Sequence, residues 1–202
     1  MTRMHILTST EIISTQDLAL NNPDWPDHIN LKHQGSNTLY EYIETNHFFN
    51  TKLWKEEDLA RRKKVSDSEI AKNKRAIDLF NQQRNDYIEK IDNYIIESLP
   101  NIKEMQGKQN SETPGAMIDR LSILSLKIFH MSFQAQRKDT DMLHVKNCKE
   151  KLIILNQQRL DLGVCFDELL NDCYHNLRYF KQYRQFKMYN DPNLNPQIYS
   201  EK

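Results

Sequence analysis

A regular stripe of apolar residues near the carboxyl end constrains the fold more than any other feature of the sequence. Its members recur at alternating spacings of three and four residues, and only one of them is charged. They are Val145, Cys148, Leu152, Leu155, Arg159, Leu162, Phe166, Leu169 and Cys173. This spacing is typical of a long helix that packs along its length against other helices. The stripe therefore predicts a helical bundle.

A second stripe with the same spacing precedes the first, and polar residues interrupt it. Its members are Ile70, Lys74, Ile77, Asn81, Arg84, Ile88, Ile91 and Ile95. Capping signals and prolines set the helix ends and predict helices over residues 8–20, 38–64, 66–98, 113–136 and 139–188. A bend is expected at Gly163 or near His175, and no strand is predicted.

These helices define the predicted architecture. The fold class is all-α: an antiparallel arrangement like a four-helix bundle, with a short N-terminal helix and an irregular C-terminal tail. We expect one helical domain over residues 1–202. Within it, residues 1–35 form a weakly structured N-terminal arm and residues 189–202 form the tail.

Composition excludes several classes of protein. The 28 basic and 28 acidic side chains cancel, which argues against a dedicated nucleic-acid-binding protein. No apolar run is long enough to span a membrane, and the first residues do not resemble a secretion signal. Cys148, Cys165 and Cys173 are odd in number, which favours free thiols in the cytoplasm over a disulfide framework. We therefore expect a cytoplasmic protein.

Charged residues in the predicted bundle interior mark a candidate ligand site. Charges there cost several kcal/mol each to desolvate unless they are paired or bind something. One interpretation is a structural ion network that sets the helix register. The other is a pocket between helices for a small anion such as a sugar phosphate. The candidate ligand-binding residues are Lys74, Asp78, Asn81, Arg84, Asp119, Arg120, Lys127 and Arg159.

Other motifs are less specific. Asn46, Asn50, Trp54, Asp58 and Arg61 lie on one side of a predicted helix. The start of the helix at Gly115 bares N–H groups, which favours an anion there. The sequence has no Gly-rich phosphate loop and no Cys-x-x-Cys pair, so neither a cofactor nor a metal site is expected.

Aromatic and basic residues alternate between residues 174 and 190. A stripe at helical spacing either packs on the bundle or contacts a protein or membrane partner; single-stranded nucleic acid is the least favoured alternative. The candidate partner-binding residues are Tyr179, Tyr183, Phe186 and Lys187.

Three blocks of the sequence resemble a bacterial family known as domain of unknown function 4254. They are residues 50–62, with Trp54 and Arg61; residues 74–86, with Asp78; and residues 111–127, with Asp119 and Lys127. Residues 186–192 also look similar. The resemblance implies a bacterial, largely helical protein, often encoded near glycosyltransferases of lipopolysaccharide assembly. It implies no catalytic residue.

Together these observations lead to one expected function and two alternatives. The expected function is an accessory or ligand-binding protein in envelope glycan synthesis, whose partner is a glycosyltransferase or a phosphorylated sugar. The first alternative is a small all-α enzyme acting on an anionic metabolite. The second is a protein-interaction module without a small-molecule site. The sequence assigns neither catalytic residues nor an oligomeric state.

Overall fold

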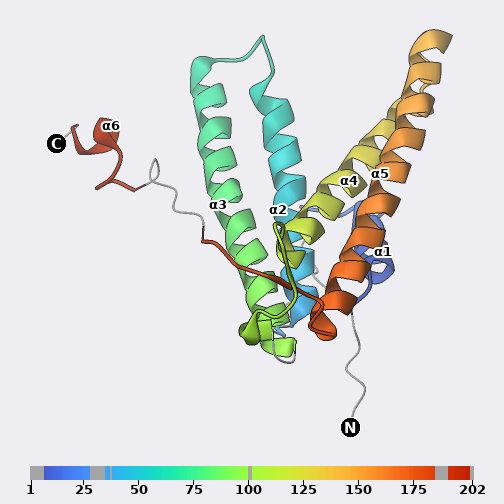
Figure 1. The fold of residues 1–202 in the computed structure, drawn as a ribbon. Helices are drawn as coiled ribbons and strands as arrows, with labels where there is room; N and C mark the ends of the chain where they lie inside the picture. Colours follow the sequence, from blue (N-terminus) through green and yellow to red (C-terminus); the bar gives the residue numbers. More distant parts are fainter. Residues whose placement is uncertain (1–6, 28–34, 37, 100–101, 185–190, 201–202) are drawn as a thin grey trace.

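Helices form most of the structure (Figure 1). The computed structural model describes residues 7–27, 35–36, 38–99, 102–184 and 191–200. The long elements are α1 (Ser9–Leu20), α2 (Leu39–Ala60), α3 (Asp67–Ser98), α4 (Pro114–Ala135) and α5 (Met142–Tyr174). Short ones are the 3-10 turn η1 (Ile102–Glu104), the strands β1 (Lys108–Asn110) and β2 (Arg178–Phe180), and α6 (Pro196–Tyr199). The predicted all-α class is confirmed.

The long helices pack as two antiparallel hairpins. Helices α2 and α3 form one hairpin, and α4 and α5 form the other. In Figure 1 the hairpins lie close together at one end and diverge toward the other, with α1 beside α4 and α5. The two hairpins therefore share one interior at the end where they lie close together. Toward the other end, the facing sides of α2 and α4 separate.

Side-chain caps account for the helix starts. Thr8 and Ser66 form reciprocal capping boxes with Glu11 and Glu69, as predicted. Thr38 accepts the backbone N–H of Glu41, whose carboxylate accepts the backbone N–H of Gly35 at 2.9 Å. Each cap supplies acceptors for N–H groups that have no partner inside the helix.

Burial along α5 follows the divergence of the hairpins. Leu162, Phe166 and Leu169 are buried in the main core, and Phe166 is fully inaccessible. Leu152 and Leu155, nearer the open end, are only partly buried. The stripe predicted from sequence is therefore continuously buried only from Leu162 onward, and in its first half Cys148 alone is buried, where the hairpins diverge.

The predicted end of the last helix was wrong. Helix α5 runs through Gly163 and ends at Tyr174, far short of residue 188. Asn176 has a positive φ of 60°, a backbone conformation that commonly follows a helix end. The chain then forms β2, which pairs in parallel with β1 and buries Phe180. Because Tyr179 lies in a strand, it is not part of a helical aromatic stripe. Helix α2 also ends early, at Ala60.

The N-terminal end of α4 is occupied by a carboxylate from α3. Asp92 is 2% exposed and accepts the backbone N–H of Gly115 at 2.6 Å. Burial raises the pKa of Asp92 to about 6, although hydrogen bonds from Thr113 and Gly115 oppose this. The anion favoured at this helix start is thus supplied by the protein itself.

We expect Gly115→Ala to lower the free energy of unfolding by about 1–3 kcal/mol, a typical cost of overpacking. An added Cβ would lie 2.6 Å from the Ile88 backbone oxygen and 2.7 Å from the Asp92 carboxylate. Gly163→Ala is the matched control, because its Cβ would meet side chains and no backbone: Ser9 at 3.0 Å and Ile13 at 3.9 Å. Urea unfolding of both variants tests this, and equal losses would contradict the tight approach at Gly115.

Candidate functional site

The structure does not gather the cations predicted to bind a ligand into one cluster. Lys74 pairs with Asp78 one turn along α3, and both side chains are exposed. Arg120 is also largely exposed and forms a two-bond ion pair with Glu112, at 2.9 and 2.7 Å. These groups lie at the surface with partners of their own.

Two further members of the predicted set lie apart from Arg84. Arg159 on α5 binds the Asp17 carboxylate of α1 at 2.7 and 3.0 Å, and donates to Ser125 at 3.2 Å. It therefore ties α1 to the second hairpin. Lys127 is exposed and shares a surface hollow of about 650 Å³ with Arg120. Ligand binding by these residues stays a prediction.

Arg84 and Asp119 do meet, at the interface between the hairpins. The Nε atom of Arg84 lies 3.8 Å from Oδ1 of Asp119, which is too long for a hydrogen bond. Asp119 is buried, and its Oδ1 accepts the amides of Asn46 at 3.0 Å and Asn50 at 2.8 Å. The carboxylate is satisfied mainly by two amides of α2.

This polar network continues deeper between α2 and α4. The Asn50 amide also donates to the Ser122 hydroxyl at 3.0 Å, and Nδ1 of His47 lies 2.8 Å from the same oxygen. His47 is 1% exposed and stacks on Trp25, with ring centroids 5.6 Å apart. Burial lowers the pKa of His47 to about 3, and the nearby Gln16 backbone carbonyl opposes this only in part. The ring is therefore neutral near pH 7.

A cavity of about 380 Å³ lies over the Arg84 end of this network. We call it the hairpin cleft. Its lining comes from α2, from the C-cap of α2, from α3 and from α4: Asn50, Leu53, Trp54, Glu57, Asp58, Arg61, Asn81, Arg84, Ile123 and Leu126. The sequence predicted that Asn50, Trp54, Asp58 and Arg61 lie on one side of a helix. The structure confirms this, because all four line the cleft. Of the predicted ligand set, the cleft brings together Asn81 and Arg84, with Asp119 beneath them.

A second hollow of about 610 Å³ adjoins the cleft and shares Trp54 and Asp58 with it. His130 lines this hollow and stacks on Trp54, with ring centroids 4.5 Å apart and the rings almost parallel. Burial lowers the pKa of His130, while the charge of Asp58 opposes this. The stack holds the Trp54 ring between the two cavities.

Charges in the hairpin cleft are unevenly paired. Arg61 forms a surface ion pair with Glu57 at 3.0 Å. The Arg84 side chain is only 26% exposed, and its Nε makes no hydrogen bond among the described residues. Its one described hydrogen bond is long, 3.4 Å to Asn85. Arg84 is therefore a largely desolvated cation with weak partners.

Sequence reasoning missed the deeper part of the network. Gln16, His47, Ser122 and Ser125 were not among the predicted site residues, although all four are at most 1% exposed. Ser122 and Ser125 stand between the apolar residues Leu121, Leu124 and Leu126 of α4. Buried hydroxyls need partners, so their position was the available signal.

The predicted partner-binding residues differ in their surroundings. Tyr179 is half-buried and its hydroxyl donates to Gln109 across the two strands, whereas Tyr183 is 72% exposed. Phe186 and Lys187 lie outside the described residues. In the described part of the chain, no group of His, Cys, Asp and Glu side chains is arranged to hold a metal ion. None of the described helices is long and apolar enough to cross a membrane.

The fold and the cleft define a helical protein with a polar interface between two hairpins. The profile of a family described as "Protein of unknown function (DUF4254)" matches residues 40–182, which is well over half of the chain. The chain therefore belongs to this family. The match covers α2 from its second residue, all of α3 to α5 and the whole hairpin cleft, and leaves out α1. No curated protein and no solved structure matches the chain.

Proposed function

We propose that this protein binds a small anionic ligand, such as a phosphorylated sugar, in the hairpin cleft, with Arg84 as the main contact to the negative charge. The role in envelope glycan synthesis that the family resemblance implies is part of this proposal. The protein would act there by holding the ligand or presenting it to a glycosyltransferase.

The state of Arg84 is the observation that carries the proposal. A buried guanidinium is costly unless good hydrogen bonds replace its water. Asp119, its only described counter-ion, is 3.8 Å away and already accepts two amides. A phosphate or carboxylate in the cleft would supply the two parallel bonds that arginine forms best.

The remaining lining suits a ligand that is more than a bare anion. Trp54, Leu53 and Leu126 provide apolar surface, while the amides of Asn50 and Asn81 can bond hydroxyl groups. Ligand pockets are typically apolar with a few placed polar groups, and their volumes begin near 300 Å³. The cleft, at about 380 Å³, fits a molecule of the size of a sugar phosphate.

Arg84→Met tests the proposal, with Lys74→Met as the matched control. Both changes remove one positive charge from α3, but Lys74 is exposed and outside the cleft. Inorganic phosphate, sugar phosphates and nucleotide sugars are added in turn while thermal unfolding is followed. A true ligand should stabilise the parent by about 2.7 kcal/mol at one hundred times its dissociation constant. We expect Lys74→Met to keep this stabilisation and Arg84→Met to lose it.

Asp119 keeps both amide donors in Arg84→Met, so we expect this variant to stay folded. Absence of any shift in the parent at millimolar ligand would contradict the proposal. An equal response in the two variants would place the anion elsewhere.

A further inference from the structure

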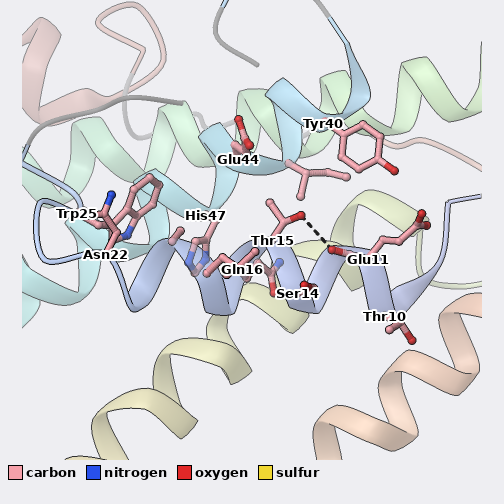
Figure 2. Close-up of a pocket in the computed structure, with 13 residues that line it drawn as sticks. Thr10, Glu11, Ser14, Thr15, Gln16, Asn22, Trp25, Tyr40, Glu44 and His47 are labelled. Atoms are coloured by element: carbon pink, nitrogen blue, oxygen red, sulfur yellow. Dashed lines mark hydrogen bonds between the residues drawn. The ribbon is translucent and has the colours of Figure 1, made fainter. Parts of the chain in front are cut away.

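A separate cavity of about 660 Å³ lies between α1 and α2, outside the hairpin cleft (Figure 2). We call it the α1–α2 pocket. Figure 2 shows Gln16 of α1 and His47 of α2 next to each other, with Trp25 at one end and Tyr40 toward the other. Each of these two polar side chains has a buried nitrogen, Nε2, without a hydrogen bond among the described residues.

The amide of Gln16 presents a donor to this pocket. Its Oε1 accepts the hydroxyl of Ser125 at 3.1 Å, and Ser125 in turn accepts a guanidinium N–H of Arg159 at 3.2 Å. In this arrangement the Ser125 hydroxyl accepts from Arg159 and donates its own proton to Oε1 of Gln16, so the NH₂ group of Gln16 faces away from Ser125. The NH₂ group of Gln16 is thus left without an acceptor, although the residue is 1% exposed.

The ring of His47 presents a second donor by the same logic. Ser122 accepts the Asn50 amide at 3.0 Å, and its own proton has one described acceptor, Nδ1 of His47 at 2.8 Å. A neutral imidazole that accepts at Nδ1 carries its proton on Nε2. The Gln16 backbone carbonyl acts on this ring, but it does not meet hydrogen-bond geometry at Nε2. Unmade hydrogen bonds of buried groups cost about 1–3 kcal/mol each, so the NH₂ group of Gln16, with the poorly paired His47 N–H beside it, indicates a missing acceptor.

The acidic lining of the pocket disfavours an anion, and the N–H groups of Gln16 and His47 disfavour a cation, which leaves a neutral acceptor. Glu11 and Glu44 belong to the lining, and no Lys or Arg does among the described residues. Both carboxylates would repel an anion. Trp25 offers ring surface only, because its N–H already donates to Thr51 at 3.0 Å. Leu18 and Ile43 add further apolar surface.

We propose that the α1–α2 pocket binds a neutral, oxygen-bearing small molecule whose carbonyl or hydroxyl oxygens accept from Nε2 of Gln16 and Nε2 of His47. This site is independent of the anion site in the hairpin cleft. Its walls come from α1, the segment that follows it and α2, so it also uses residues outside the matched family segment.

Three probes that share one ring but differ in charge test this proposal. They are N-acetylglucosamine, which is neutral, its 1-phosphate and the protonated amine glucosamine. Glycerol, glucose and nicotinamide extend the neutral set. Ligand binding is followed by NMR of the full chain, with ¹⁵N-labelled histidine reporting on the His47 ring. We expect a neutral probe to bind at millimolar concentration and to shift the His47 Nε2 resonance, and we expect the phosphate to leave it unchanged.

Gln16→Met and Ser125→Ala form the matched pair of variants. Both break the bond between these two residues, but only Gln16→Met removes the donor from the pocket. We expect Gln16→Met to weaken binding at least tenfold. Ser125→Ala frees the orientation of the amide but keeps its donor, so it should weaken binding less, and Arg84→Met should keep the parent affinity. Ala19 also lines the pocket, so Ala19→Trp places a bulky ring in it and should abolish binding.

Two results would overturn the proposal. One is that no neutral probe shifts the His47 resonance of the parent chain. The other is equal affinity of Gln16→Met and Ser125→Ala for the neutral probe. If Gln16→Met does not fold, binding by Ala19→Trp with the affinity of the parent chain would overturn the proposal instead. Because Arg84 is not part of this pocket, failure here leaves the cleft proposal standing, and the reverse also holds.

Discussion

Replacing Asp119 by Ala is expected to lower the free energy of unfolding by about 2–5 kcal/mol, because two buried amides lose their acceptor at about 1–3 kcal/mol each. The change leaves Arg84 without its counter-ion, and the amides of Asn46 and Asn50 without their shared acceptor. Unfolding in urea, with unchanged slope, measures the loss.

The double variant Arg84→Met with Asp119→Ala separates these contributions. Removing the uncompensated cation should recover part of the stability that Asp119→Ala loses, which gives a coupling free energy in a double-mutant cycle. A loss below about 1 kcal/mol in Asp119→Ala would mean that the carboxylate is not held as the structure shows.

Acid should destabilise the protein through His47, and His47→Gln should remove that effect. The pKa of His47 is about 3 in the folded chain, against an ordinary value of 6.5. Between these values the unfolded chain binds more protons, so stability is complete above pH 6.5 and falls as the pH drops toward 3. At 1.36 kcal/mol per pKa unit, we expect the wild type to lose about 3 kcal/mol more than His47→Gln between pH 7 and pH 4.

Asp92 works in the opposite direction and supplies the control. Its folded-state pKa is raised from 3.8 to about 6, so its contribution falls as the pH rises through that window. Asp92→Asn lacks this offsetting contribution, so its free energy of unfolding should fall more steeply than that of the wild type as the pH drops. Parallel pH profiles for wild type and His47→Gln would contradict a buried, neutral ring.

The sequence predicted the helices better than their ends. Local signals specify starts such as those at Ser66 and Thr113, because a cap depends on a few neighbouring residues. The end of α5 at Tyr174 depends on a strand pairing with residues 108–110, far away in the chain. Periodic aromatic residues masked that turn, since the same spacing continues past the helix.

Sequence reasoning was right about the residues that share one helix face. The shared side of Asn50, Trp54 and Asp58 follows from helical spacing alone. The grouping of five cations failed because spacing does not fix the rotation of each helix or the partner that each charge finds. Arg120 and Lys74 find carboxylates close by in the chain, Glu112 and Asp78, which sequence reasoning did not pair with them.

The two cavities are connected through one buried hydrogen-bond path. It runs from His47 at the α1–α2 pocket through Ser122 and Asn50 to Asp119, under Arg84 at the hairpin cleft. Three helices meet along this path, so its polar groups position the walls of both cavities.

The most direct test of the account is where an anion binds on the intact protein. Crystals soaked in tungstate, a heavy analogue of phosphate, would locate it by anomalous scattering. We predict the main peak in the hairpin cleft, within hydrogen-bonding distance of the Arg84 guanidinium and beside Trp54. Peaks only at exposed cations such as Lys74 or Arg120, with the cleft empty, would contradict the account.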